Sequence, residues 1–171
     1  MPTSIIKASL TLTAAFLILT ASAWAEPHDT LDRYFWARVV HVADGDTIEV
    51  VKQGDKLEMV KVRLYGLDAP EDGQAFGKRA GRELKRLVHK KIVMVEVMQK
   101  RDKYGRVVGI VRTQAGVDVG RELAKAGYMW VDSRFCKPSR VCRGYWVAVR
   151  EAQRDKLGLW KELAMPPWKW R

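Results

Sequence analysis

Three charged side chains that are costly to place together lie within residues 61–71 (KVRLYGLDAPE). Alternating apolar and polar residues predict a strand that carries Arg63, and the Asp-Ala-Pro-Glu corner places Asp68 and Glu71 on the turn that leaves this strand. A cation beside two carboxylates at a strand end costs free energy to assemble unless the charges have a use. The stretch therefore indicates a site for an anion or a metal ion.

Two other polar stretches carry residues of the same kind. Asp46 lies in the sequence DGDT just before a run of β-branched residues, and Arg106 ends the sequence DKYGR. Each stretch taken alone is also typical of an ordinary turn before a strand, and Arg63 alone is also typical of a surface cation. The elements around these stretches decide whether their charged residues can meet.

Alternating hydrophobicity predicts five short strands. The third strand carries Val60, Val62 and Leu64 on one face and Arg63 on the other. Turn signals between the first three strands favour an antiparallel meander. The strands are expected from residue 38 onward, over residues 47–52, 57–65, 92–97 and 107–112.

Helical periodicity follows the third strand, where an apolar stripe runs from Phe76 to Val88. A short helix is expected over residues 121–126 and a last one over residues 145–157, each ending before a glycine. This order predicts an α+β fold, mainly β: a five-stranded OB-type barrel with three α-helices. Such barrels often bind oligonucleotides or oligosaccharides, but the fold alone does not establish a function.

The charge of the chain favours a polyanionic partner. Its 171 residues include 31 Lys and Arg against 20 Asp and Glu, a formal net charge of +11. Nucleic acid and anionic membrane both fit this excess, and so does a simple contribution to solubility.

The N-terminus predicts export. Residues 1–25 combine Lys7, an apolar run over residues 10–20 and the small-x-small pattern Ala23-Trp24-Ala25, which is typical of a cleaved signal peptide; an uncleaved anchor is the alternative. We expect a leader over residues 26–37, one folded domain over residues 38–161 and a loosely held tail over residues 162–171. The mature protein is then periplasmic or secreted, has no stable membrane span, and is expected to be a monomer.

Taken together, the three charged stretches resemble the staphylococcal nuclease (thermonuclease) family. The resemblance is carried by DGDT at residues 44–47, RLYGLDAPE at 63–71 and DKYGR at 102–106, in that order. It continues through FGKRAGRELKRLV at 76–88, LAKAGY at 123–128 and GLW at 158–160. It implies an OB barrel with three helices that cleaves DNA and RNA with Ca²⁺.

The resemblance also implies roles for individual residues. Asp46 and Asp68 would hold the metal through carboxylates and Ala69 through its backbone carbonyl, an all-oxygen set that suits Ca²⁺. Arg63 and Arg106 would grip the cleaved phosphate, and Glu71 would position the attacking water. The remaining implied residues line the nucleotide pocket: Lys103, Tyr104, Tyr128 and Trp130.

The sequence departs from the family in two places near the site. Trp130 replaces a tyrosine, so it lacks a phenolic hydroxyl, and the stretch from Glu71 to Phe76 is shorter than the basic loop of the family prototype. The short stretch is expected to open the cleft and to leave activity intact. For Tyr128 and Trp130, packing in the core is the alternative to base stacking.

Cys136 and Cys142 lie in a predicted polar loop over residues 132–143 and are absent from the prototype. In an exported protein this spacing predicts a disulfide. Zinc is a poorer alternative because His28, His41 and His89 show no ligand spacing.

The leading hypothesis is an exported, Ca²⁺-dependent nuclease acting on DNA and RNA. A catalytically inactive OB-fold module that only binds nucleic acid is the main rival, although it gives no reason to keep Asp46, Asp68, Glu71, Arg63 and Arg106 together. A cationic domain that binds the cell envelope or oligosaccharides would explain the charge but not the acids.

Overall fold

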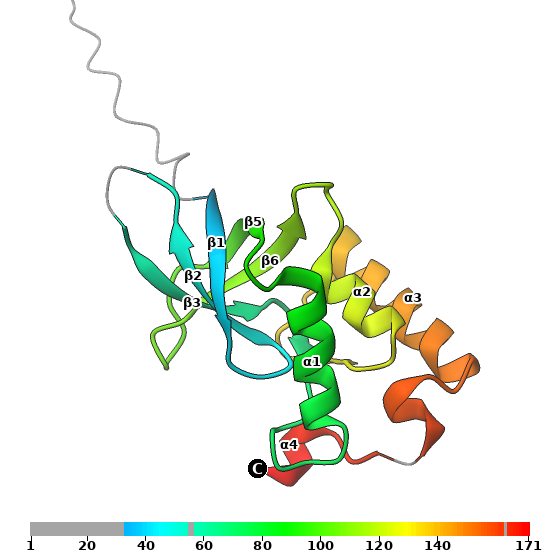
Figure 1. Ribbon diagram of the computed structural model, residues 1–171. Helices are drawn as coiled ribbons and strands as arrows, with labels where there is room; N and C mark the ends of the chain where they lie inside the picture. Colours follow the sequence, from blue (N-terminus) through cyan, green and yellow to red (C-terminus); the bar gives the residue numbers. More distant parts are fainter. Residues whose placement is uncertain (1–32, 55–56, 163) are drawn as a thin grey trace, which may run out of the picture.

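The computed structural model describes residues 33–54, 57–162 and 164–171 and shows a closed five-stranded barrel flanked by helices (Figure 1). The barrel order is β1-β2-β3-β6-β5, in which β3 and β6 are parallel and every other neighbouring pair is antiparallel. The predicted OB-type barrel and its antiparallel meander are therefore confirmed. Its strands are β1 (Tyr34–Val42), β2 (Thr47–Lys52), β3 (Met59–Leu64), β5 (Ile92–Gln99) and β6 (Val107–Thr113).

The apolar faces of the strands fill the barrel as the alternating pattern predicts. In β3, Val60, Val62 and Leu64 are buried, whereas Lys61 is exposed. Because successive side chains of a strand point to opposite faces, Arg63 lies on the outward face with Lys61. The barrel wall therefore carries the arginine out of the core and toward the residues that follow β3.

The first strand begins before the predicted boundary at residue 38. Tyr34 already pairs with Glu96 of β5, so residues 34–37 belong to the barrel and not to a leader. Buried Ala37 and half-buried Phe35 alternate with exposed Tyr34 and Trp36, which is the strand period, and this aromatic run directly follows a polar stretch. The predicted signal peptide and residues 26–32 lie outside the described part of the chain.

The three predicted helices are present, and the last one starts earlier than expected. They are α1 (Gly77–Val88), α2 (Val119–Lys125) and α3 (Arg140–Arg154). The α1 stripe of Ala80, Leu84 and Val88 is buried, as predicted. Helix α3 starts at Arg140 because the Ser139 hydroxyl accepts a hydrogen bond from the Cys142 backbone N–H, 3.2 Å away, and so caps the helix.

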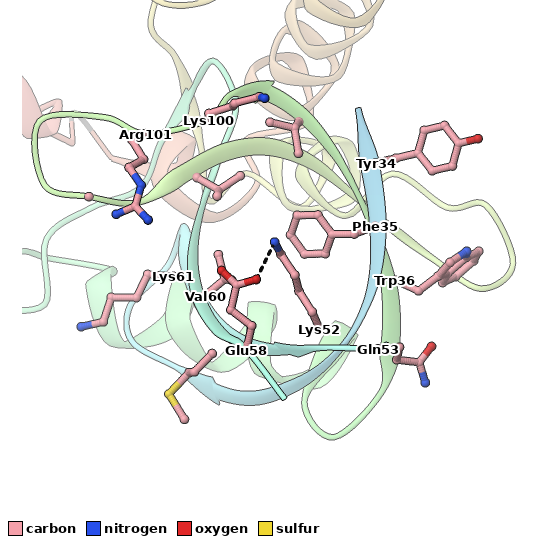
Figure 2. Close-up of a pocket in the computed structure, with 14 residues that line it drawn as sticks. Tyr34, Phe35, Trp36, Lys52, Gln53, Glu58, Val60, Lys61, Lys100 and Arg101 are labelled. Carbon is pink, nitrogen blue, oxygen red and sulfur yellow. Dashed lines mark ion pairs between the residues drawn. The ribbon is translucent and has the colours of Figure 1, made fainter. Parts of the chain in front are cut away.

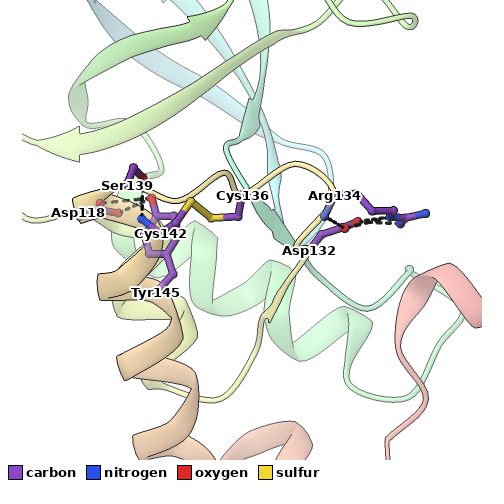
Figure 3. The surroundings of a disulfide bond; sticks show 7 residues. All are labelled: Asp118, Asp132, Arg134, Cys136, Ser139, Cys142 and Tyr145. Atoms are coloured by element: carbon purple, nitrogen blue, oxygen red, sulfur yellow. Dashed lines mark hydrogen bonds and ion pairs between the residues drawn. A yellow bond between two sulfur atoms is a disulfide. The ribbon is translucent and has the colours of Figure 1, made fainter.

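The disulfide predicted between Cys136 and Cys142 is present, with Cα atoms 5.6 Å apart (Figure 3). Cys142 lies in the first turn of α3 and not in a loop, so the bond ties this helix to the chain that follows β7 (Trp130–Val131). It also packs beneath Gly66, which has a φ of +67° and where an added Cβ would lie 2.4 Å from the Cys136 sulfur. The disulfide therefore supports the turn between β3 and β4 (Leu67–Asp68).

The C-terminal segment is ordered against the domain, contrary to the expectation of a loosely held tail. After the 3₁₀ helix η2 (Gly158–Lys161), the short helix α4 (Pro167–Trp170) begins with a buried proline, since proline is tolerated at the first helical position. The Trp168 ring lies 6.4 Å from Trp130 and 5.9 Å from the Arg134 guanidinium. Figure 1 shows α4 at the foot of α1, beside the loop that leads into that helix.

A hollow of about 760 Å³ lies at one end of the barrel (Figure 2). The start of β1, the end of β2 and the start of β3 form its wall. Among the described residues, none of the helices is long and apolar enough to cross a bilayer.

Replacing both cysteines by serine should lower the free energy of unfolding by about 2–2.5 kcal/mol, because the bond closes a small loop whose freedom the unfolded chain regains. Urea unfolding of oxidised wild type and of the double variant measures the loss, and wild type treated with a reductant is the matched control. Equal stability of the three samples would show that the disulfide does not brace the fold.

Candidate active site

Asp46 is held by a turn that brings it against helix α1. The Asp44 carboxylate accepts a hydrogen bond from the Asp46 backbone N–H at 2.9 Å, and a Cβ added to Gly45 would lie 2.6 Å from the Cβ of Ala69 and 2.8 Å from that of Ala80. Only glycine allows this close approach. The DGDT stretch is thus a turn whose glycine lets Asp46 reach the chain that follows β4.

Asp68 comes from β4, the two-residue strand after the Gly66 turn, and is only 2% exposed. The next residue links it to Asp46, because the Ala69 backbone N–H donates to an Asp46 carboxylate oxygen at 2.9 Å. The Thr47 hydroxyl donates to the other Asp46 oxygen at 2.9 Å. These bonds fix both acids within one buried network.

Arg63 lies between the two acids. Its Nη1 pairs with an Asp46 oxygen, and its Nη2 donates to Asp68 Oδ1 at 2.6 Å and to the Leu67 carbonyl at 3.1 Å. The Arg63 side chain is 15% exposed, so all three charges are largely out of water. Two adjacent buried carboxylates repel each other, and the guanidinium is what holds them together.

The pKa values of these groups follow from burial and from their neighbours. Burial alone raises the pKa of Asp46, but the charge and hydrogen bonds of Arg63 outweigh it and hold that pKa below its ordinary value. Burial raises the pKa of Asp68 by more than Arg63 lowers it. Burial and then the charge of Asp46 raise the pKa of Asp44 to about 6. The site therefore carries anionic charge that is only partly balanced by Arg63.

Glu71 lies on the turn between β4 and α1, with its side chain 41% exposed. The Gln74 side-chain carbonyl accepts from the Glu71 backbone N–H at 3.1 Å, and a Cβ on Gly77 would lie 2.0 Å from the Glu71 carbonyl oxygen. The start of α1 and this turn are thus packed backbone to backbone. Glu71 is held near the buried acids but remains open to solvent.

Arg106 and Tyr104 come from the loop between β5 and β6. Asp102 organises this loop, since it accepts from the backbone N–H groups of Tyr104 and Arg106 and pairs with the Arg106 guanidinium at 2.8 Å. The Arg106 guanidinium lies 5.1 Å from the centre of the Tyr104 ring, which is 69% exposed. The DKYGR stretch is therefore a turn that presents a cation and an aromatic face together.

These segments enclose one cleft of about 250 Å³. Five of the six residues that the sequence assigned to metal, phosphate or attacking water line it, namely Asp46, Arg63, Ala69, Glu71 and Arg106. Asp68 joins them through Arg63. The lining residues are Asp44, Asp46, Arg63, Ala69, Pro70, Glu71, Tyr104, Arg106 and Arg171.

Of the four residues predicted to bind the nucleotide, only Tyr104 lines this cleft. Trp130 is 7% exposed and packs edge-on against Trp160, at 5.8 Å between ring centres. Tyr128 is half-buried against the core, and the Lys103 ammonium lies 4.9 Å from the Tyr104 ring centre. Trp130 and Tyr128 therefore pack against the core in this structure, which is the alternative to base stacking that the sequence also allowed.

Arg171 belongs to the cleft although no motif singled it out. Its Nη2 donates to both Asp68 oxygens, at 2.8 and 3.1 Å, and its Nε pairs with Glu71. The Gln74 side-chain amide donates to the Met165 carbonyl. The short stretch from Glu71 to Phe76 was expected to leave the cleft open, but the C-terminal segment approaches it there. A contact across a hundred positions leaves no local signal in a single sequence.

The donor set fits a hard divalent cation. Asp46 and Asp68 offer carboxylate oxygens on either side of one guanidinium, and the Ala69 backbone is tied to the first of them. No group of three or more His, Cys, Asp or Glu side chains is arranged as a metal site within the described residues. Two carboxylates with a backbone carbonyl and waters suit Ca²⁺ or Mg²⁺ better than zinc, which favours nitrogen and sulfur.

Comparison with known proteins identifies the family. A model of the family described as "Staphylococcal nuclease homologue" matches residues 61–162. This chain belongs to that family. It is 39% identical over 135 residues to an "Uncharacterized endonuclease" of Escherichia coli, covering 78% of this chain and 83% of the relative. It is 34% identical over 168 residues to a "Micrococcal nuclease" of Shigella flexneri, covering 92% of this chain and 88% of the relative.

Replacing Arg63 by alanine should lower the free energy of unfolding by about 3–5 kcal/mol, because it leaves two buried carboxylates without their shared cation. Urea unfolding in the presence of a chelator measures the loss. Arg106→Ala is the matched control, and its more exposed ion pair should contribute no more than about 1 kcal/mol. If the two variants lose the same stability, Arg63 does not hold the acids together.

Proposed function

We propose that this protein is a nuclease that hydrolyses phosphodiester bonds of DNA and RNA with the help of Ca²⁺. One observation carries the proposal: Asp46, the solvent-accessible Glu71, Arg63 and Arg106 line a single cleft, and the buried Asp68 joins them through Arg63. The dianionic, phosphorane-like transition state is stabilised by cations, and the attacking water needs a base. The arginines and the carboxylates of this cleft meet these two requirements. The family membership and the nuclease names of its relatives support the same function.

Asp46, Asp68 and the Ala69 carbonyl would hold the metal ion. Calcium bound there supplies positive charge that stabilises a phosphate oxygen. The hydrogen bonds from the Thr47 hydroxyl and the Ala69 backbone N–H to Asp46 would keep this carboxylate oriented toward a metal ion.

Arg106 and Arg63 would bind the phosphate that is cleaved. Asp102 pairs with the Nε and Nη2 groups of Arg106, so the two Nη1 hydrogens and the second Nη2 hydrogen stay available to a phosphate oxygen. Arg63 is shared between Asp46 and Asp68 and adds positive charge beneath the same oxygens. Charge that develops on phosphate in the transition state strengthens both interactions.

Glu71 would take the proton of the attacking water. It is the most exposed of the three acids in the site and lines the cleft, so water reaches it directly. The water oxygen forms a bond to phosphorus, the bond from phosphorus to the leaving oxygen breaks, and the carboxylate receives the proton of the water.

Tyr104 would support action on both DNA and RNA. Its exposed ring beside Arg106 offers a stacking face, and stacking accepts any base. The neighbouring Lys103 adds positive charge to the same loop.

Export to the periplasm or beyond is part of the proposal. The signal-like N-terminus predicts it, and the Cys136–Cys142 disulfide supports it because such bonds persist in oxidising compartments. A secreted or periplasmic nuclease would meet nucleic acid that comes from outside the cell.

Wild type should cleave single-stranded DNA and RNA with Ca²⁺ and lose this activity in excess chelator. Glu71→Gln and Arg106→Ala should each lower kcat by about 10²–10³-fold, since each removes a group that acts in the transition state. Glu83→Gln and Arg86→Ala, which break an exposed ion pair on α1, are the matched controls. Cleavage that persists with chelator, or that survives both site substitutions, would refute the assignment.

A further inference from the structure

The hollow at the barrel end combines aromatic rings with positive charge. Four cations line it against one carboxylate, Glu58, which pairs with Lys52 at 2.9 Å. Figure 2 shows Phe35 and Lys52 within the mouth, and the Lys52 ammonium lies 4.9 Å from the Phe35 ring centre. The cations are Lys52, Lys61, Lys100 and Arg101.

Two further rings stand at the outer side of the mouth. Tyr34 is 55% exposed and Trp36 is 41% exposed, and Figure 2 shows both pointing away from the barrel interior. Exposed rings next to lysine and arginine suit a ligand that has flat bases and a negative backbone. A neutral oligosaccharide would use the rings but gain nothing from the positive charge of the hollow.

Two elements lead from the hollow to the candidate active-site cleft. On the outward face of β3, Lys61 lines the hollow and Arg63 lines the cleft, a spacing of about 6–7 Å along the strand. In the loop between β5 and β6, Gly105 borders the hollow, whereas Arg106 borders the cleft. A strand whose phosphate rests on the two arginines therefore has a basic path into the mouth of the barrel.

We propose that the barrel mouth is an extended substrate site that binds nucleotides of a single-stranded nucleic acid several positions away from the cleaved bond. This inference rests on the proposed nuclease function. Single strands are favoured over duplexes because base faces must be free to stack on Tyr34 and Trp36.

The first test measures binding without cleavage. Fluorescence anisotropy in excess chelator gives the Kd for a labelled twenty-nucleotide oligothymidylate and for a dinucleotide. Trp36→Ala and Arg101→Ala should each weaken binding of the long strand at least about fivefold and leave the dinucleotide unchanged. Trp146→Ala and Arg121→Ala are the controls: Trp146 is 39% exposed on α3, and Arg121 is exposed on α2.

The second test measures cleavage with Ca²⁺. The Trp36 and Arg101 variants should raise KM for the long strand and keep the wild-type kcat/KM for a dinucleotide. An unchanged Kd and KM for the long strand would overturn the extended site while leaving the nuclease intact. A protein that binds the long strand through Trp36 but cleaves nothing would keep the extended site and refute the nuclease.

A separate observation concerns the C-terminal segment, which is anchored over the cleft. Pro167 is buried, Trp168 packs against Trp130, and the Met165 carbonyl accepts from Gln74. These contacts hold Arg171 where its guanidinium spans Asp68 and Glu71. The same two acids are those proposed to bind the metal and to orient water.

We infer that Arg171 is a tethered cation that competes with the divalent ion for Asp68 and Glu71. Both Asp68 oxygens accept from its Nη2, and Oδ1 also accepts from Arg63, so few lone pairs remain for a metal. Arginine does not lose its proton in proteins, so only displacement of the side chain frees the acids. This inference rests on the proposed metal site.

Titration calorimetry of the full chain with Ca²⁺ and no nucleic acid tests the competition. Arg171→Gln should bind Ca²⁺ about tenfold more tightly than wild type, because charge-assisted hydrogen bonds to Asp68 no longer oppose the ion. Lys169→Gln, which removes an exposed charge from the same helix, should leave the Kd unchanged.

Trp168→Ala provides a second variant that keeps Arg171 but removes its anchor, and it should also tighten Ca²⁺ binding. Equal or weaker Ca²⁺ binding by Arg171→Gln would overturn the competition. Absence of Ca²⁺ binding in wild type and in every variant would refute the metal site and the competition together, whereas the long-strand anisotropy in excess chelator is independent of both.

Discussion

The buried guanidinium of Arg63 is the interaction on which the site depends. Asp46 lies in the turn before β2 and Asp68 lies in β4, and both carboxylates are almost fully removed from water. The two carboxylates repel each other, and the Arg63 guanidinium between them offsets this repulsion by pairing with both. A hydrophobic replacement would fold as well or better, so such a network at a cleft is explained by use and not by stability.

Close backbone approaches bring the three charged segments to this guanidinium. Gly45 lets the first turn lie against Ala69 and Ala80, and Gly77 lets the start of α1 press on the Glu71 carbonyl. Gly66 adopts a left-handed conformation above the disulfide, where a side chain would meet the Cys136 sulfur. The barrel supplies the rigid frame, and these glycines set how closely the loops at its edge can pack.

Short-range patterns in the sequence predicted many local features of the fold. The strand period placed Arg63 on the outward face of β3, and the three motifs supplied acids and arginines that meet in the structure. The sequence patterns missed the start of β1, where the aromatic run Tyr34-Phe35-Trp36 directly follows a polar stretch, and the first turn of α3, which the Ser139 cap creates within an apparent loop. They also predicted a loosely held tail, although Pro167 starts the short helix α4 there.

Contacts between segments that are far apart in the chain could not be predicted from the sequence. Among the features of the cleft, these contacts change its electrostatics most. Two arginines, Arg63 and Arg171, face Asp46, Asp68 and Glu71 in this structure, so most of the negative charge of the acids is balanced before any ligand arrives. A basic substrate path leading from the barrel mouth then meets a cleft that does not repel phosphate strongly. Replacing Arg171 by a divalent ion adds one positive charge at the point where phosphate would bind, so exchange of the two cations would favour anion binding only when the ion is present.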